Sequence, residues 1–268
     1  MPERLIATDE SSLSDKVYAS LRLALLRGKF LPDETLSLRI LAASLGTSPM
    51  PVRVAVQRLI AEKALVQTAS RAIKVAPFTY ETFKDLMRIR MELEGFAAER
   101  ACMCKEPGLV ERLRTYNQSM LEAAQNYDVE AALAANYSFH FGVYEAAGLP
   151  QLTEMISNLW LRAGPYLAAV QRQPRASEIL STNSYKIQDR VIEAIRTRNR
   201  KAARFALAMD LRFAFAWFLK NYDFSDNRLG GPIINRRDAA DNHSPNFRAA
   251  AKDEPKPNVT AFSDQTNS

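Results

Sequence analysis

The sequence predicts a mainly α-helical protein in two parts, an N-terminal winged helix-turn-helix and a C-terminal antiparallel all-α bundle. Three observations support this fold class. Three short helical patterns separated by turns are followed by two short apolar stretches that suit a β-hairpin. A longer region then keeps the apolar period of a helix without any competing β alternation. The remainder, residues 223–268, is rich in Gly, Pro, Asn, Asp and Ser and loses that period.

The elements of the first part follow from apolar spacing and helix-end signals. Helices are expected over residues 14–27, 39–45 and 49–62, a connecting turn over 30–34, and hairpin strands at 64–67 and 73–75. Ser48 is a good N-cap for the third helix. Pro49 suits its first position, because the missing N–H has no helical partner there. Val52, Val56 and Leu59 share one face of this helix, which is therefore expected to face the core.

Charge is concentrated in the same part of the chain. Residues 1–12 are expected to be a flexible N-terminus and residues 13–76 the winged helix-turn-helix domain. Residues 1–78 hold 11 Lys/Arg against 7 Asp/Glu, which is +4 of the chain's net +6. A basic excess around a helix-turn-helix favours DNA as the partner. From these residues alone, a small helical domain with a hairpin and no DNA role remains the alternative.

The second part follows a short linker at residues 77–80. Helices are expected over residues 80–102, 109–126, 128–147, 151–171, 177–197 and 201–221, with Gly, Pro or polar residues at the breaks. Six helices of this length form an antiparallel bundle over residues 81–222. Residues 223–268 cannot bury enough apolar surface to offset the entropy lost on ordering, so this tail is predicted to be disordered.

Composition restricts the class of protein. The chain has 268 residues, 47% hydrophobic and 25% charged, which is the usual mix of a globular protein. No apolar stretch approaches the roughly 18 residues of a membrane span, and the N-terminus lacks the apolar core of a secretory signal. Cys102 and Cys104 are too few for a disulfide framework and do not match a zinc knuckle. We therefore expect a cytoplasmic protein with no membrane partner.

Common enzyme signatures are missing from the sequence. It has only two histidines, His140 and His243, so a site of three histidines cannot form within one chain. Neither the phosphate-binding glycine motifs nor the G-x-S-x-G nucleophile motif occurs. The sequence thus predicts that the protein is not an enzyme. A metal hydrolase on the bundle is a poor alternative, with one useful histidine and no clear nucleophile–base pair.

Several stretches resemble a known family. Residues 17–75 resemble the DNA-binding domain of the GntR superfamily of bacterial transcriptional regulators, through VYASLRLALLRGKFLPDETL, LAASLGTS and PVRVAVQRLIAEKALV. The helical remainder resembles the effector-binding domain of the FadR-like subfamily, called FCD, through RMELE, FHFGVYEAAGLPQL and VIEAIRTRNRKAARFAL. Together the matching stretches cover about residues 13–221 in the family's order.

The resemblance implies that the third helix enters the major groove of DNA. Its start usually reads S-R-T-P-V-R-E-A-L in the family. This sequence keeps Arg53 but has Pro49, Met50 and Val54 in place of Arg, Thr and Glu. Proline and methionine side chains cannot hydrogen-bond to guanine, so the family's operator sequence does not carry over. The candidate DNA-binding residues are Arg39, Ser48, Met50, Arg53, Gln57, Arg58, Arg71 and Lys74. A solvated surface is the alternative for these side chains.

The FCD subfamily often holds a divalent metal through Asp or Asn and three histidines. By resemblance, Asn136 and His140 match the first pair, while Gln188 and Asp210 stand where the family has its other two histidines. Losing two imidazoles is expected to weaken Zn²⁺ or Ni²⁺ binding sharply. We therefore expect a metal-free pocket whose polar groups bind an organic effector directly. No cofactor is certain, and the alternative is a weakly bound divalent metal on Asn136, His140 and Asp210.

Arg90 completes the candidate effector residues. It could anchor an effector carboxylate through a bidentate pair, or join helices through an internal ion pair. Trp160, Tyr166 and Trp217 could line the pocket, but aromatic residues at helical spacing are more typical of a core.

The resemblance implies a ligand-responsive transcriptional repressor that binds a palindromic double-stranded DNA operator as a homodimer. A small metabolite, by family habit an organic acid, would control it. The alternative is a helical ligand-binding module with degraded DNA specificity that acts through weak DNA binding or a protein partner. Pro49 and Met50 motivate this alternative.

Overall fold

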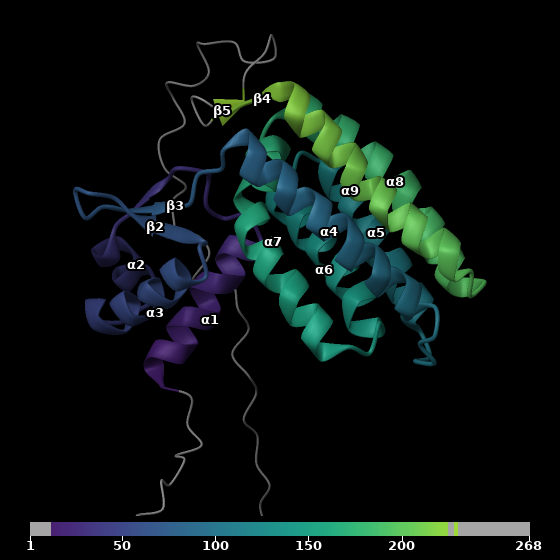
Figure 1. Cartoon of the computed structure of the whole chain (residues 1–268), viewed down its shortest axis with the longest axis horizontal. Helices are drawn as coiled ribbons and strands as arrows, with labels where there is room; N and C mark the ends of the chain where they lie inside the picture. Colours follow the sequence, from purple (N-terminus) through teal and green to yellow (C-terminus); the bar gives the residue numbers. More distant parts are fainter. Residues whose placement is uncertain (1–11, 225–227, 230–268) are drawn as a thin grey trace, which may run out of the picture.

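The computed structural model describes residues 12–224 and 228–229. The N-terminal part comprises α1 (Leu13–Leu26), β1 (Thr35–Leu36), α2 (Leu38–Ser44), α3 (Pro49–Ala61), β2 (Leu65–Gln67) and β3 (Ile73–Val75). The C-terminal part comprises α4 (Tyr80–Ala101), α5 (Leu109–Gln125), α6 (Val129–Ala146), α7 (Pro150–Gln171), α8 (Pro174–Arg196) and α9 (Arg200–Asn221), then β4 (Tyr222–Asp223) and β5 (Arg228–Leu229). Figure 1 shows the two parts side by side. The predicted mainly α fold class is confirmed.

The N-cap of the first helix lies one residue before the predicted domain. Ser12 is its N-cap: the Ser12 hydroxyl accepts from Asp15 N–H at 3.2 Å, and the Asp15 carboxylate accepts from Ser12 N–H at 3.1 Å. This reciprocal capping box satisfies two backbone donors at the helix start. Assigning Ser12 to a flexible N-terminus was therefore wrong. The rest of that predicted segment lies outside the described residues.

The start of α3 differs in one detail from the sequence interpretation. Ser48 is the N-cap residue, but its hydroxyl makes no capping hydrogen bond. N-cap side chains bond the N–H of the second or third helical residue, and the third here is Pro51, which has none. The fixed backbone angle of Pro49 at the first position supports the helix start instead.

The wing is a three-stranded antiparallel sheet in the order β1-β3-β2. The predicted hairpin is present, with Leu65 opposite Val75. The third strand, β1, falls just after the predicted connecting turn and pairs Thr35 with Lys74. Two residues are too few to show an alternating pattern, so only the pairing reveals this strand. Arg71 lies in the β2–β3 turn with φ 64°, a left-handed conformation that glycine normally adopts.

The bundle helices begin and end within one residue of their predicted ends, except that α8 starts at Pro174 rather than at Ser177. Proline is favoured at the first position of a helix, so Pro174 starts α8 rather than only breaking the chain. The most extensive helix contacts are between α4 and α9, α5 and α6, and α8 and α9. Among the described helices, none combines the length and hydropathy needed to cross a bilayer.

The predicted disordered tail begins too early. Tyr222 pairs with Leu229 and Asp223 with Arg228 in a short antiparallel ribbon. Tyr222 is buried and stacks on Phe218, with ring centroids 4.4 Å apart, while Phe224 packs edge-on against it. This aromatic anchoring orders residues 223, 224, 228 and 229, so the expectation of disorder was wrong for them. The rest of the predicted tail lies outside the described residues.

The two parts meet where α1 crosses α7 (Figure 1). Gly164 of α7 lies against the backbone of α1, and a Cβ there would overlap the carbonyl oxygen of Leu25. At the end of α1, a Cβ on Gly28 would lie 2.5 Å from Ala168 Cβ. Arg22 of α1 adds hydrogen bonds of 2.9 Å to the side chains of Ser157 and Asn158 on α7. The contact is therefore close enough for a shift of α7 to move α1.

Candidate functional site

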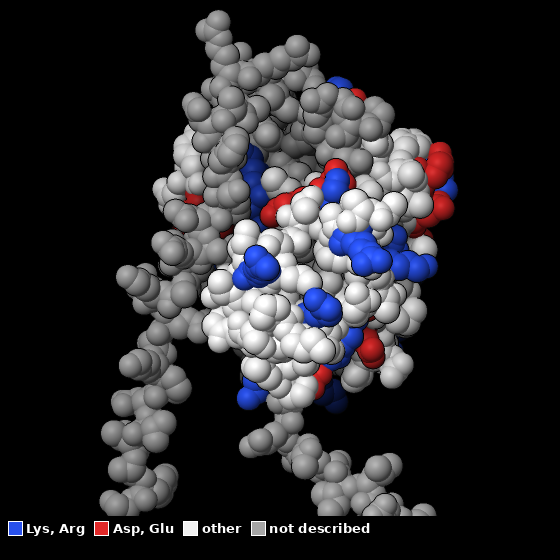
Figure 2. All heavy atoms as spheres, turned by 90° about the vertical axis from the view of Figure 1, so that its left-hand side faces the viewer, with Lys and Arg blue, Asp and Glu red and all other residues white. Residues whose placement is uncertain are grey.

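The predicted DNA-binding face of α3 is exposed to solvent. Met50 is 66% exposed, and Arg53 and Gln57 follow on the same outer side, while Val52, Ala55, Val56 and Leu59 are buried. Arg39 of α2 and Ser48 are exposed as well. Figure 2 views the molecule from the side of α2, α3 and the wing, where Lys and Arg stand in separate groups on a largely uncharged surface. The face can therefore reach a macromolecular partner.

Two of the candidate DNA-binding cations are held by acidic neighbours. Arg58 is ion-paired with Asp15 and lies over the Tyr18 ring, 3.8 Å from its centroid. Lys74 donates to both carboxylate oxygens of Asp33, at 3.0 and 3.1 Å. Within residues 12–224, by contrast, the exposed Arg39, Arg53 and Arg71 take part in no salt bridge, so their charges are available.

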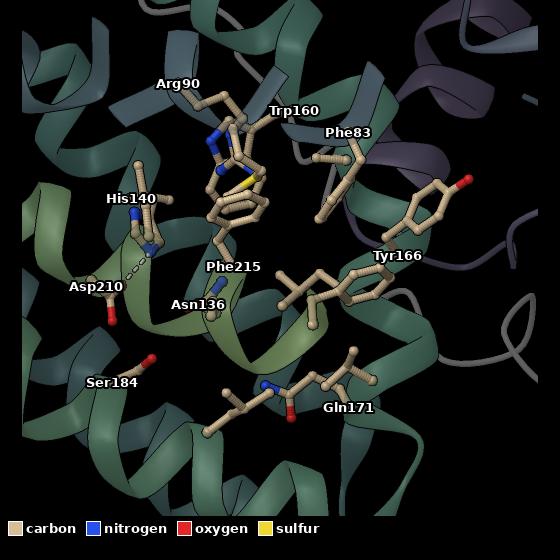
Figure 3. A pocket seen from close by; sticks show the side chains of 18 of the residues that line it. Phe83, Arg90, Asn136, His140, Trp160, Tyr166, Gln171, Ser184, Asp210 and Phe215 are labelled. Atoms are coloured by element: carbon tan, nitrogen blue, oxygen red, sulfur yellow. Dashed lines mark hydrogen bonds and ion pairs between the residues drawn. The ribbon is translucent and has the colours of Figure 1, made fainter. Parts of the chain in front are cut away.

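The second candidate site is a cavity inside the bundle. Its empty volume is about 710 Å³, including open solvent at its mouth. Most of its lining is apolar, supplied by Phe83, Met87, Met120, Trp160, Ala163, Tyr166, Leu167, Val170, Leu180, Leu211, Ala214, Phe215 and Phe218. In Figure 3, His140, Asp210 and Ser184 lie on one side of the cavity, and Phe83 and Tyr166 on the other. An apolar cavity with a few polar groups is typical of a small-molecule site.

The structure brings together the four polar residues that the resemblance singled out. Gln188 Nε2 lies 3.2 Å from Asn136 Oδ1, 3.3 Å from Asp210 Oδ2 and 3.5 Å from His140 Nε2. His140 Nε2 is also 3.3 Å from Asp210 Oδ2. All four side chains are buried. Asn136, His140 and Asp210 line the cavity, and Gln188 lies behind them.

A hydrogen-bonded chain orients His140. The Tyr144 hydroxyl donates to Glu94, and it lies 3.0 Å from His140 Nδ1. Burial, together with the adjacent Glu94 carboxylate, raises the pKa of Tyr144 well above its ordinary value, so its proton is retained. Because that proton goes to Glu94, the phenol oxygen accepts from Nδ1–H of His140. The other ring nitrogen, Nε2, faces Gln188 Nε2 and Asp210 Oδ2.

Arg90 forms an ion pair within α4, with Glu94 four residues later, and so does not join two helices, which was the alternative considered from the sequence. Its Nε lies 2.6 Å from Glu94 Oε1, and its guanidinium lies 4.6 Å from the centroid of the Trp160 ring. Arg90 still lines the cavity, but its charge is compensated by Glu94. Trp160 and Tyr166 are both buried and both line the cavity, so each belongs to the core and to the pocket wall at once. Trp217 does not line the cavity and packs, partly buried, against the apolar cluster that includes Phe83 and Phe218.

The metal set of the FCD subfamily does not fit this cluster. The lone pairs of Asn136, His140 and Asp210 converge on one point, where the Gln188 amide nitrogen lies and donates to two of them. An amide N–H₂ has no lone pair for a metal. A single imidazole with one carboxylate and two amides is also a poor set for Zn²⁺ or Ni²⁺.

Some residues of the site were missed by sequence reasoning. Glu94 and Tyr144 form the chain behind His140, and Ser184 lines the cavity. A signal for Tyr144 existed: it follows His140 by four residues, as His140 follows Asn136, so all three share a helix face. Cys102 is buried, and burial raises the pKa of its thiol, which does not suit a reactive cysteine.

Two family models match the chain in the same two parts. The model of bacterial regulatory proteins of the gntR family matches residues 13–75. The FCD domain model matches residues 85–213. The first range covers α1 to β3, and the second covers nearly all of the bundle that holds the cavity.

Similar proteins agree with this division. The HTH-type transcriptional regulator McbR of Escherichia coli (strain K12) is 27% identical over 213 residues, which cover 79% of this chain and 95% of that protein. The solved structure of E. coli McbR/YncC matches with a TM-score of 0.72 and 26% identity, over 80% of this chain and 100% of that one. A GntR regulator from Rhodococcus sp. RHA1, 23% identical, shares the fold with a TM-score of 0.65 over 80% of this chain and 100% of its own.

Proposed function

The chain belongs to the GntR family of bacterial transcriptional regulators and carries an FCD effector domain, and from this premise we propose a specific mode of action. The protein binds a palindromic operator as a homodimer through α3 and the wing. A small molecule in the bundle cavity changes that binding, and by family habit it relieves repression. Such a regulator works in the cytoplasm, where the DNA is.

One observation carries this proposal: α7 contacts both the cavity and the DNA-binding domain. Trp160, Ala163, Tyr166 and Leu167 line the cavity from α7. Gly164, one residue after Ala163, lies against the backbone of α1. A ligand that prefers one placement of α7 thereby prefers one placement of α1 and the domain attached to it. This is the linkage that ligand-controlled DNA binding requires.

An exposed apolar surface supports the dimer. Ile89 and Phe96 on α4 and Phe205 and Met209 on α9 are all more than one-third exposed. The two helices pack on each other, so these side chains belong to one face of the bundle. Exposed apolar side chains gathered on one face are typical of an interface, and a second copy of this chain is the occupant we propose.

Candidate DNA contacts follow from exposure and free charge. Arg53 and Gln57 on α3 suit base and phosphate contacts, Arg39 and Arg71 suit phosphates, and Ser48 and Met50 lie at the start of the same face. For Arg58 and Lys74 to contact DNA, their ion pairs with Asp15 and Asp33 must first break.

The test is a fluorescence-anisotropy titration against the gene's own upstream DNA and a scrambled sequence of equal length. It is run at two salt concentrations, because basic proteins bind any DNA at low salt. We expect a preference of about a thousand-fold for the upstream DNA at physiological salt. Equal, salt-sensitive binding to both sequences would contradict specific regulation from this site. It would favour the module with degraded DNA specificity, for which the exposed Pro49 and Met50 are the supporting observation.

A further inference from the structure

The polar wall of the bundle cavity lacks one hydrogen-bond donor. Asp210 lines this wall and is 4% exposed. Its Oδ2 atom faces Gln188 Nε2 and His140 Nε2, each at 3.3 Å. Its Oδ1 atom is buried and has no hydrogen-bond partner among the described residues. A buried carboxylate oxygen without a donor is unfavourable, so the wall is complete only when something supplies one.

The neighbouring residues do not supply that donor. His140 Nδ1 faces the Tyr144 hydroxyl and His140 Nε2 faces Asp210 Oδ2, so neither ring nitrogen bonds Oδ1. The Gln188 amide group is already shared between Asn136 and Asp210 Oδ2. The missing donor must therefore come from a molecule inside the cavity.

The charge of the wall points to the kind of donor. Among the lining residues that the structure describes, Arg90 is the only cation of the Lys/Arg type, and Glu94 compensates it through a buried ion pair. Asp210 therefore faces the cavity with no Lys or Arg among the described lining residues left to compensate it. A carboxylate ligand would meet Asp210 without a free cation, and taking Arg90 from Glu94 would leave a buried carboxylate unpaired.

The rest of the cavity suits an apolar body. Phe83 and Tyr166 form the side opposite Asp210 and Ser184 (Figure 3), and Phe215 and Trp160 add further aromatic surface. Aromatic faces both bury an apolar group and attract a nearby cation.

We propose that the cavity binds an apolar or aromatic amine, whose ammonium group donates to Asp210 Oδ1 while its hydrocarbon part packs among Phe83, Tyr166 and Phe215. This inference rests on the proposed function in one respect, that the occupant is the effector. It replaces the family expectation of an organic acid with a ligand of opposite charge.

The test compares three probes with the same phenyl body and different heads: 2-phenylethylamine, 2-phenylethanol and 3-phenylpropanoate. Isothermal titration calorimetry on the full chain without DNA measures binding up to about 10 mM, the range expected for probes of this size. We expect the amine to bind about ten-fold or more tighter than the acid, with the alcohol between them. MnCl₂ and ZnCl₂ are titrated in the same way.

The variant D210N removes the acceptor charge, and D189N on the exposed surface of α8 is its matched control. We expect D210N to abolish the preference for the amine and D189N to keep it. The wild-type comparison stands by itself if D210N fails to fold. Tighter binding of the acid, absence of amine binding, or saturation by a metal ion with no amine binding would each overturn the proposal.

The DNA titration keeps the two proposals distinct. Amine binding without any effect on specific DNA affinity would leave the ligand class standing and remove the effector role. Specific DNA binding by a chain that does not bind the amine would leave the proposed DNA-binding function standing and overturn the amine proposal.

Discussion

The amide nitrogen of Gln188 lies 3.3 Å from Asp210 Oδ2, at the point on which the Asn136 and His140 acceptors also converge. One side-chain amide thus takes the central position among three acceptors, and its two N–H groups satisfy two of them. The cluster is held together by hydrogen bonds across α6, α8 and α9. Two acceptors of the cluster, Gln188 Oε1 and Asp210 Oδ1, have no donor among the described residues, and of the two residues Asp210 lines the cavity.

Replacing Gln188 by histidine should convert this cluster into a metal site. Q188H removes the central donor and adds a second imidazole beside His140 and Asp210, a set that suits Zn²⁺ or Ni²⁺. After dialysis, elemental analysis should find less than about half an equivalent of transition metal in the wild-type chain and close to one equivalent in Q188H. N183H, which adds an imidazole elsewhere on α8, should behave as wild type. A full equivalent in the wild-type chain would contradict the poor fit inferred here.

Arg53 and Arg58 should separate DNA binding from stability. Arg53 is exposed and takes part in no salt bridge within residues 12–224, so R53A should weaken specific DNA binding about ten-fold or more with little change in Tm. Arg58 ties α3 to α1 through Asp15 and Tyr18, so R58A should lower Tm slightly and affect DNA binding less. Anisotropy titrations and thermal denaturation of both variants provide the comparison. If R58A instead weakened DNA binding more than R53A, Arg58 would have to leave Asp15 to contact DNA.

Gly164 should be intolerant of a side chain. In G164A the new Cβ would overlap the Leu25 carbonyl oxygen and lie 3.1 Å from the Leu26 carbonyl oxygen, and backbone atoms cannot move aside alone. We expect a loss of about 1–3 kcal/mol of unfolding free energy, measured by denaturant titration. G142A is the matched control, because its Cβ would meet side chains and no backbone, Leu113 Cδ2 at 3.1 Å and Tyr116 Cε2 at 3.8 Å. If both variants are equally stable, α1 and α7 do not meet as closely as the structure indicates.

Glu34 should make stability depend on pH. Burial raises the pKa of this carboxyl, although the Leu31 N–H donates to it at 2.7 Å and Arg172 opposes the shift. The folded protein therefore holds the proton more tightly than the unfolded chain. The stability linked to Glu34 is fully present below the ordinary pKa of 4.5 and is lost as pH rises through the folded value.

The variant E34Q tests this direction of the pH dependence of stability. Its Tm relative to the wild type should rise between about pH 4 and about pH 7, because only the wild type must ionise a partly buried group. The exposed Glu154 supplies the control E154Q, for which no such trend is expected. A relative Tm that falls with rising pH would mean that the Glu34 carboxylate is stabilised by its partners rather than penalised by burial.

Sequence reasoning succeeded where the signal is local. Helix ends were placed well because helix-end signals such as Pro49, Gly108 and Pro150 act within a few residues of themselves. It failed at β1, whose two residues become a strand only through pairing with β3. It also missed the short strand pair after α9, in which Asp223 pairs with Arg228 and the preceding Tyr222 packs on the Tyr166 ring of α7.

For the candidate site, too, some features were readable from the sequence and others were not. The helical spacing of Asn136 and His140, and the family pattern that added Gln188 and Asp210, were readable from the chain. The donor direction of Tyr144 and the central position of the Gln188 amide were not. The sequence by itself determined the elements, the family and the residues of the cluster, because these depend on short-range periodicity and motif. Only the tertiary structure decided which charges are free and which acceptor lacks a donor, because those depend on side chains brought together from helices far apart in the chain.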